Sequence, residues 1–256
     1  MSLQDAEIIS YLADGALPDG SEVDFIDAHG ADFSQSVHSD CIFRFTDLHR
    51  SDLRGAMFIG CSFHNVDLGE ALMERAIFVD CEFIGCGLAQ IVAYKARFTR
   101  CTFLRSSLLG AYLEQTRFED CTFEACGISS LVTQTVAAGS VFDEVVFRSS
   151  SLECIDADSA HFLACKIDTV SMYGSILTGA NIYLSVFESV DLSAAYIDMA
   201  TVEDSLISGN MHGVDLSTTL VKNSDLSGAT GEALVTQDTE IIESVLSPHF
   251  TLKEEN

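Results

Sequence analysis

Residues 41–90 read, in blocks of five, CIFRF TDLHR SDLRG AMFIG CSFHN VDLGE ALMER AIFVD CEFIG CGLAQ. The third residue of every block is large and apolar, and the first is small. The pattern extends in both directions, with a large apolar residue at all but one central position from Phe43 to Ile128 and again from Phe142 to Ile207. A strict period of five matches neither an amphipathic helix nor a single alternating strand. It predicts an internal repeat in which each block is one structural unit.

The two exceptions to the pattern are informative. In Ile91-Val92-Ala93 and again in Ile155-Asp156-Ala157, the large residue stands first and the small one third. A swap that conserves volume is the kind that a packed interior tolerates. Both positions of a block are therefore expected to point into the same core.

The sequence also repeats with a longer period of twenty residues, which is four blocks of five. Cysteine and phenylalanine recur at this spacing, in the series Cys41, Cys61, Cys81, Cys101, Cys121; Phe43, Phe63, Phe83, Phe103, Phe123; and Phe58, Phe78, Phe98, Phe118. Four blocks then make one turn of a coil, and identical residues stack on neighbouring turns. A four-sided coil repeating at the β spacing of about 4.8 Å satisfies both periods.

Several blocks carry the pattern small residue, Asp, Leu in full: Ser51-Asp52-Leu53, Val66-Asp67-Leu68, Val190-Asp191-Leu192 and Ser224-Asp225-Leu226. In this the chain resembles the pentapeptide-repeat family. The resemblance implies an all-β fold, a right-handed quadrilateral β-helix, over roughly residues 31–228. Family members differ widely in what they do, so the resemblance predicts architecture more than function.

The sequence also suggests where the repeats begin, slip and end. Residues 1–30 are expected to form an N-terminal cap, with a short helix over 3–14 followed by a linker. The repeat phase slips by one residue near 129–141 and near 208–213. Residues 229–256 are expected to form a C-terminal cap and tail, with a helix over 232–246. The apolar residues of that helix predicted to face inward are Leu234, Ile241, Ile242 and Val245.

Charge and composition exclude several functional classes. The chain has 13 Lys and Arg against 39 Asp and Glu, a formal net charge of −26, which argues against direct binding to nucleic acid or an anionic membrane. No apolar run is long enough for a membrane-spanning helix, and the acidic start lacks the basic region of a signal peptide. We therefore expect a cytoplasmic protein. Eight of the nine cysteines occupy the small inward position, which favours reduced, buried thiols over a metal or disulfide framework.

Catalysis is not indicated by any motif. Nucleophile, phosphate-binding and zinc signatures are missing, and a coil filled with side chains has flat sides rather than a concave pocket. The sequence predicts a non-enzymatic interaction protein without cofactor or metal.

An acidic stretch is the first candidate binding surface. Residues 167–221 contain no Lys or Arg and seven acids: Asp168, Glu188, Asp191, Asp198, Glu203, Asp204 and Asp215. One interpretation is solubility, which negative charge promotes. The other is mimicry of DNA, because some members of the family that the chain resembles, the quinolone-resistance proteins, are understood to protect DNA gyrase, a type II topoisomerase, in this way. The competing hypothesis is a rigid scaffold, spacer or effector-type module whose acidity serves solubility alone.

An apolar patch is the second candidate. Outward positions on neighbouring turns hold Met57, Ile59, Ile77, Val79, Ile84 and Leu104, with Leu109 close by. Apolar residues clustered in this way are usually covered by another surface. The segment 16–30, a second copy in a homodimer, and a protein partner are the three candidates for that cover.

Overall fold

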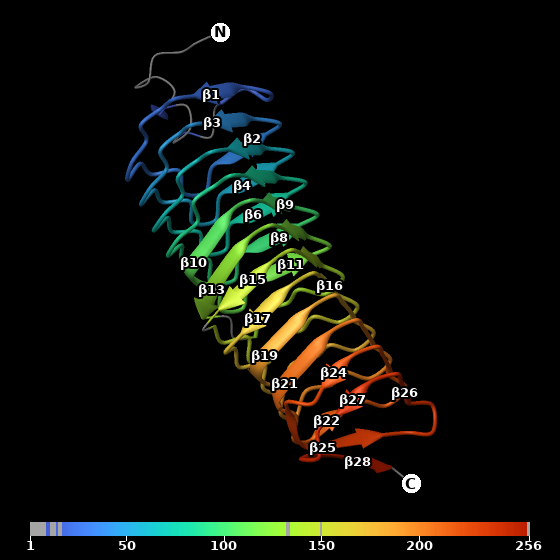
Figure 1. The fold of residues 1–256 in the computed structure, drawn as a ribbon. Coiled ribbons are helices and arrows are strands. Elements are labelled where there is room, and N and C mark those ends of the chain that lie inside the picture. Colours follow the sequence, from blue (N-terminus) through green and yellow to red (C-terminus); the bar gives the residue numbers. More distant parts are fainter. Residues whose placement is uncertain (1–8, 11–13, 15–16, 132–133, 149, 255–256) are drawn as a thin grey trace. The chain divides into compact units, whose positions relative to one another are not determined.

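A computed structural model describes residues 9–10, 14, 17–131, 134–148 and 150–254. The chain divides into two compact units, residues 1–131 (unit 1) and 132–256 (unit 2). Each unit is a parallel β-solenoid with four sides per coil, which confirms the all-β repeat fold (Figure 1). We number the sides 1 to 4 in the order in which the chain visits them.

In unit 1, sides 1 and 4 carry regular short strands. Side 1 is made of β1 (Glu22–Asp24), β3 (Ile42–Arg44), β5 (Ser62–His64), β7 (Glu82–Ile84), β9 (Thr102–Leu104) and β12 (Thr122–Glu124). Side 4 is made of β2 (Val37–Ser39), β4 (Met57–Ile59), β6 (Ile77–Val79), β8 (Arg97–Thr99) and β11 (Arg117–Glu119). Sides 2 and 3 pair mainly through single bridges, and on the last coils through β10 (Ser107–Tyr112) and β13 (Gly127–Leu131).

In unit 2, the regular strands lie on sides 1 and 2. Side 1 is made of β14 (Val141–Asp143), β16 (His161–Leu163), β18 (Asn181–Tyr183), β20 (Thr201–Glu203), β23 (Leu220–Lys222) and β26 (Glu240–Ile242). Side 2 is made of β15 (Val146–Arg148), β17 (Lys166–Asp168), β19 (Val186–Asp191), β21 (Leu206–Asn210), β24 (Asp225–Leu226) and β27 (Val245–Leu246). On sides 3 and 4, β25 (Ala229–Val235) pairs with β22 (Val214–Asp215) and β28 (Phe250–Glu254).

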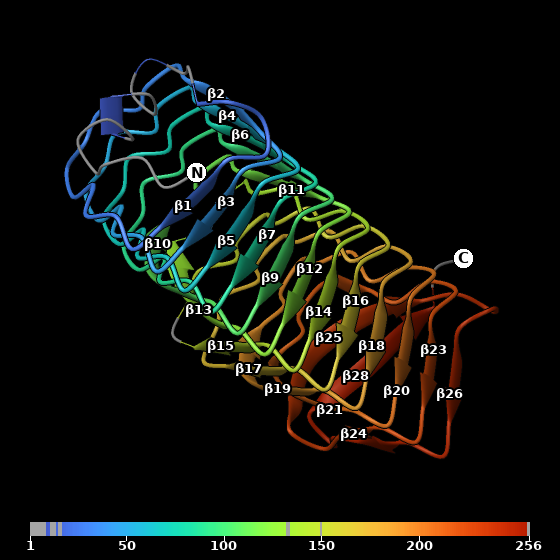
Figure 2. The same ribbon diagram turned by 90° about the horizontal axis from the view of Figure 1, so that it is seen from above.

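The twenty-residue period is the register of the stacked strands. Phe43 pairs with Phe63, and Phe63 with Phe83, in parallel. Figure 2 shows their strands β3, β5 and β7 side by side. Inside the coil, the rings of Phe63 and Phe83 stack with centroids 4.9 Å apart, while Phe58 from side 4 meets Phe63 edge-on at 5.5 Å. Offset stacks and edge contacts are the preferred aromatic geometries. The phenylalanine series therefore forms two continuous ladders that share one core.

Most corners are turned by one residue in the left-handed backbone region. Phe45, Arg50 and Gly55 close successive blocks with φ of 51°, 58° and 67°. Non-glycine residues rarely adopt this region because their side chain crowds the backbone. The corner is held nonetheless by a hydrogen bond to the next coil, such as that from the Arg50 backbone N to the Gly69 carbonyl oxygen at 2.8 Å.

The small inward residues also bond from coil to coil. The Cys81 thiol donates to the carbonyl oxygen of Phe58, 3.4 Å away on the preceding coil. Burial raises the pKa of Cys86 to about 11 and that of Cys165 to about 12. These thiols are therefore neutral and serve as core residues.

The side chains of both swapped blocks point into the core, because Ile91, Ala93, Ile155 and Ala157 are all buried. Each swapped block therefore fills the core with the same total volume, one small and one large side chain, as an ordinary block.

The predicted C-terminal helix over 232–246 is wrong. Those residues lie in β25, β26 and β27, and form a further coil. Ala233 and Val235 are the buried residues, whereas Ile242 and Val245 are 41% and 57% exposed. The physical reason is the open edge of the preceding coil, which offers unpaired backbone groups to any chain that follows it.

At the N-terminus, the coil begins earlier than residue 31. β1 pairs with β3, and Val23, Ile26 and Ala28 are buried, so this segment belongs to the solenoid rather than to a linker. The predicted helix over 3–14 falls largely outside the described residues.

The two phase slips appear as shifts in strand register. In unit 1 the pairing of β10 with β13 shifts between Leu109 and Ala111. In unit 2 the pairing of β19 with β21 shifts between Phe187 and Val190, opposite Gly209. Gly209 has φ 122°, and a Cβ there would lie 2.1 Å from the Val190 carbonyl oxygen. Only glycine fits this bend.

The swapped block gives a test of core packing. Ala93→Leu alone should overfill the coil and lower the free energy of unfolding by about 1–3 kcal/mol. Ile91→Ala added to it should restore much of that loss. Urea unfolding of the single and double variants measures both effects, and a double variant no more stable than the single one contradicts the paired-volume interpretation.

His38 gives a second test, because it stands where the ladder of Phe58 would continue. Its ring stacks on Phe58 at 5.0 Å, and its Nε2 contacts the Ser36 hydroxyl at 2.9 Å. Its buried Nδ1 has no hydrogen-bond partner within the described ranges. Burial lowers the pKa of His38. The neutral His38 ring therefore contributes its full share to the free energy of unfolding above the pKa of the unfolded state, about 6.5. That contribution is lost as the pH falls through the lower pKa of the folded state.

His38→Phe should raise the free energy of unfolding by about 1 kcal/mol near neutral pH, because it removes an unpaired polar atom. The gain should grow as the pH is lowered below about 6.5. Unfolding curves at several pH values measure it, and a gain that does not change with pH contradicts the assignment.

Candidate interaction surfaces

Side 4 of unit 1 brings together four of the predicted patch residues. Met57 pairs with Ile77, and Ile59 pairs with Val79, so they form two outward rows on β4 and β6. Val37 on β2 extends the first row. Val37 is 50% exposed and Ile59 is 38% exposed. We call these five residues the apolar strip.

The other predicted patch residues lie elsewhere. Ile84 and Leu104 pair with each other on side 1, and Leu109 is an exposed residue within β10. The segment 17–30 builds the first coil, so the predicted cover by residues 16–30 is not what these described residues provide.

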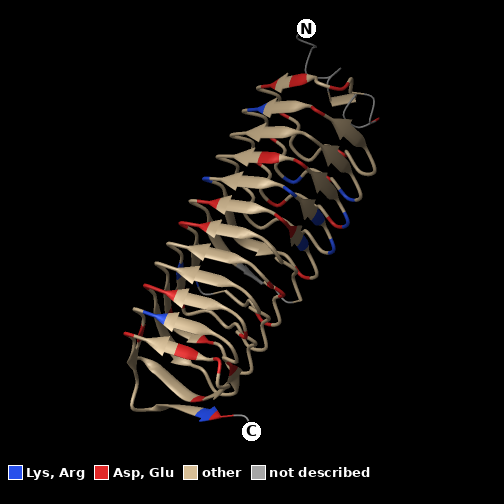
Figure 3. Ribbon diagram, turned by 90° about the vertical axis from the view of Figure 1, so that its right-hand side faces the viewer, with Lys and Arg blue, Asp and Glu red and all other residues tan. Residues whose placement is uncertain are grey.

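Basic residues continue the apolar strip, and the sequence analysis missed them. Arg97 and Arg117 follow Ile77 in the same outward row. Arg75 and Lys95, spaced by twenty, stand at the adjoining corner. We call these four residues the basic cluster. Nine of the thirteen Lys and Arg belong to unit 1, and Figure 3 shows most of the blue segments on its coils. The twenty-residue spacing was the signal that could have revealed the cluster.

Most of the chain's cations have an acidic partner. Arg44 meets Asp24 at 3.2 Å, and Arg100 meets Asp80 at 2.7 Å. Within the basic cluster, Arg117 lies 3.6 Å from Glu119, and the Lys95 ammonium lies over the Tyr94 ring. Neither Arg75 nor Arg97 forms an ion pair with any residue that the structure describes.

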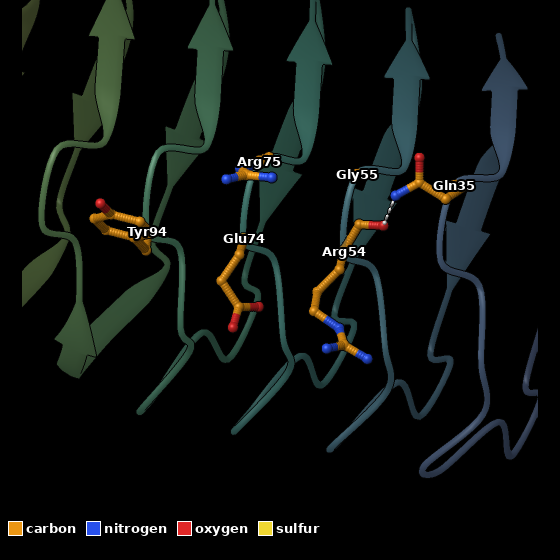
Figure 4. A pocket seen from close by; sticks show the side chains of 6 residues that line it. All are labelled: Gln35, Arg54, Gly55, Glu74, Arg75 and Tyr94. Carbon is orange, nitrogen blue, oxygen red and sulfur yellow. Dashed lines mark hydrogen bonds between the residues drawn. The ribbon is translucent and has the colours of Figure 1, made fainter.

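A shallow cavity of about 240 Å³ lies beside this corner of unit 1. It is lined by Gln35, Arg54, Gly55, Glu74, Arg75 and Tyr94 (Figure 4). The Gln35 side-chain amide donates to the Arg54 carbonyl oxygen at 3.0 Å. The Arg54 guanidinium bonds Asp52 at 2.9 Å and holds the pKa of that carboxyl below its ordinary value. Glu74 Oε2 is buried and has no hydrogen-bond partner among the residues that the structure describes.

The seven predicted acids do not share one face. Asp168 and Glu188 are in register on side 2, as predicted. Glu203 lies on side 1, and Asp204 closes that block at the corner. Asp191 lies at the start of side 3, and Asp198 and Asp215 lie on side 4. Positions five residues apart fall on successive sides, so a stretch rich in acids surrounds the coil.

Two of these acids shape the backbone. Asp191 Oδ1 accepts hydrogen bonds from the Ser193 backbone N at 3.1 Å and from the Ser193 hydroxyl at 2.6 Å. Asp215 accepts from the Ser217 backbone N at 2.9 Å. This is an Asx turn, in which the side chain replaces a backbone acceptor. It explains why Asp precedes the central residue in the repeat.

The remaining acids differ in how they are paired. Glu188 lies 3.8 Å from Lys166, and Glu203 lies 2.7 Å from Lys222. Asp198 accepts from the Thr178 hydroxyl at 2.7 Å. Exposed ion pairs of this kind contribute about 0–1 kcal/mol, so these acids affect surface charge more than stability.

Among the described residues, no helix has the length and apolar character needed to cross a bilayer. In the same part of the chain, no three His, Cys, Asp or Glu side chains are grouped as metal ligands.

Comparing Asp191 with Asp168 separates the two uses of carboxylates. Asp191→Ala removes the turn acceptor and should lower the free energy of unfolding by about 1 kcal/mol, whereas Asp168→Ala should change it by less than about 0.5 kcal/mol. Asp191→Asn keeps an acceptor and should resemble the wild type. Urea unfolding compares the three, and equal losses at positions 191 and 168 would overturn the turn assignment.

Three solved structures resemble the fold. HetL, a pentapeptide repeat protein involved in heterocyst differentiation regulation from the cyanobacterium Nostoc sp. strain PCC 7120, is 19% identical, with 90% of this chain and 98% of that chain covered and a TM-score of 0.39. QnrB1, a plasmid-mediated fluoroquinolone resistance protein, is 16% identical in a trypsin-treated form, with 89% and 90% covered and a TM-score of 0.28. A pentapeptide repeat protein from the Arabidopsis thaliana thylakoid lumen is 16% identical, with 43% and 63% covered and a TM-score of 0.21.

With TM-scores below 0.5, these likenesses say nothing about function. No curated protein matches the sequence. Residues 29–65 match the family of pentapeptide repeats, described as eight copies. Together with the five-residue pattern of burial in both units, this match confirms the resemblance to pentapeptide-repeat proteins and the pentapeptide-repeat fold of the chain.

Proposed function

We propose that the chain is a non-enzymatic protein-interaction module, and that unit 2 presents a charge density like that of DNA to a basic protein surface. Inward side chains fill each coil, so recognition depends on the outer faces. The observation that carries the proposal is the amount and spread of negative charge on unit 2.

The charge density of unit 2 is close to that of a duplex. Residues 132–256 hold 19 Asp and Glu against 4 Lys and Arg, a net charge of −15. Six stacked coils, at about 4.8 Å each, span about 29 Å. This gives one net negative charge per ~2 Å, where duplex DNA carries one per ~1.7 Å.

The distribution of these acids also supports mimicry. A duplex carries phosphates around its whole circumference, and unit 2 carries acids on all four sides, for example Glu203, Asp168, Asp191 and Asp198. A basic channel that surrounds DNA would meet carboxylates at every wall. Some members of the family that the chain resembles, the quinolone-resistance proteins, protect DNA gyrase, and this analogy suggests a type II topoisomerase as the partner.

The test measures binding of the full chain to purified gyrase in competition with duplex DNA. We expect binding that weakens steeply as salt rises from about 50 to about 200 mM, since it replaces ionic contacts. We also expect supercoiling activity to survive a quinolone better when the chain is present. The triple charge reversal Asp168→Lys, Glu188→Lys, Asp204→Lys should reduce binding at least tenfold.

The matched control reverses three outward acids of unit 1, Glu82→Lys, Glu114→Lys and Glu124→Lys. Both triple variants change the net charge equally, so solubility and long-range charge are affected alike. If neither or both lose binding to the same extent, mimicry by unit 2 is rejected. An absence of binding at low salt leaves the scaffold or spacer as the function.

A further inference from the structure

We propose that the apolar strip and the basic cluster on unit 1 together form a docking site for an extended segment of a protein partner that carries apolar side chains followed by carboxylates. This goes beyond the proposed function, because it concerns another unit and the opposite charge. The site is one row of the solenoid, Val37, Met57, Ile77, Arg97 and Arg117, with the residues beside it.

The apolar half of the site is a flat, pleated surface. Met57, Ile77 and Val79 lie on paired strands of three residues each. Their backbone groups are hydrogen-bonded to adjacent coils, for example from the Met57 N to the Ser36 carbonyl oxygen at 2.8 Å. Binding there therefore costs little ordering of the protein, and burial of apolar side chains supplies the affinity.

Two residues of the basic half, Arg75 and Arg97, lack the counter-charge that most other cations have within the described part of the chain. Acids outnumber bases threefold, yet Arg75 and Arg97 form no ion pair with a described residue, while Arg44, Arg50 and Arg100 do. At physiological salt, charges act over about 8 Å. Although Glu119 offsets the charge of Arg117, the exposed guanidinium groups of Arg75 and Arg97 remain available to a carboxylate ligand in a chain of net charge −26.

Charge complementarity selects a segment with carboxylates. An arginine binds a carboxylate through two parallel hydrogen bonds, and the adjoining strip requires apolar side chains in the same ligand. From Val37 to Arg117 the row spans four coil steps, about 19 Å at ~4.8 Å each. An extended segment of about six residues, at ~3.3 Å per residue, covers that distance.

A second copy of the chain fits this site poorly. In a twofold contact the same surface meets itself. With the coils running in opposite directions, Arg97 would face the apolar Met57 of the other copy. With the coils running the same way and the twofold axis on this row, the two basic clusters would face each other. Neither arrangement pairs Arg75 and Arg97 with carboxylates.

The test uses a phage-displayed library of random twelve-residue peptides, selected on the full chain at about 0.15 M salt. We expect enrichment of peptides in which apolar residues precede two or more Asp or Glu. Synthetic copies of the enriched peptides, labelled with fluorescein, are then titrated with the chain by fluorescence anisotropy. Arg97→Glu and Met57→Gln should each weaken binding at least tenfold.

The matched controls are Arg105→Glu, a corner arginine of side 1 with no ion pair to a described residue, and Ile42→Ser, which occupies the same place in β3 as Met57 does in β4. Both should bind within twofold of the wild type, and circular dichroism should show that all four variants are folded. Swapping Glu for Lys in the peptide should abolish binding.

Three outcomes overturn the proposal: no enrichment, enriched peptides without carboxylates, or binding unaffected by Arg97→Glu. None of them bears on the gyrase experiment, which probes unit 2. A failure of charge mimicry in unit 2 likewise leaves the peptide result standing.

Discussion

The structure depends on backbone hydrogen bonds that join each coil to the next at a register of twenty residues. The Ser62 backbone N bonds the Cys41 carbonyl oxygen at 2.9 Å, and the Glu82 N bonds the Cys61 carbonyl oxygen at 3.0 Å. This register leaves room for one small and one large inward side chain on each side of a coil. It also places side chains of the same type on top of one another in neighbouring coils. The left-handed corner residues and the phenylalanine ladders both follow from it, because neither is stable without the neighbouring coil.

The same register determines what the surface can present. Outward residues twenty apart become neighbours at about 4.8 Å, whatever their distance along the chain. The sequence thus predicted the core, where Phe63, Cys81 and the Ile91/Ala93 swap are all buried. It also predicted the stacking of Asp168 on Glu188. Both conclusions used the correct period.

The predictions that failed used local proximity instead. The expectation of one acidic surface over residues 167–221 follows from their closeness in sequence, although residues five apart point to successive sides. The segment 232–246 was read with a helical period, although the edge of the coil before it was the stronger influence. The basic cluster was missed because Arg75 and Lys95, or Arg97 and Arg117, are far apart in sequence and meet only through the register.

The second residue of each five-residue block, just before the large central one, affects both the backbone turn and the surface that the block presents. Where it is Asp, as at Asp47 and Asp67, its carboxylate accepts the backbone N two residues on, and a turn follows. None of the three-residue strands in the described part of the chain begins with Asp. On side 4 of unit 1 that position instead holds Met57, Ile77 and Arg97, so the side is both straight and free of turn-forming carboxylates. The residue type at this one position therefore has two effects: it lets the side form a regular ladder of strands, and it gives the side an apolar and basic surface.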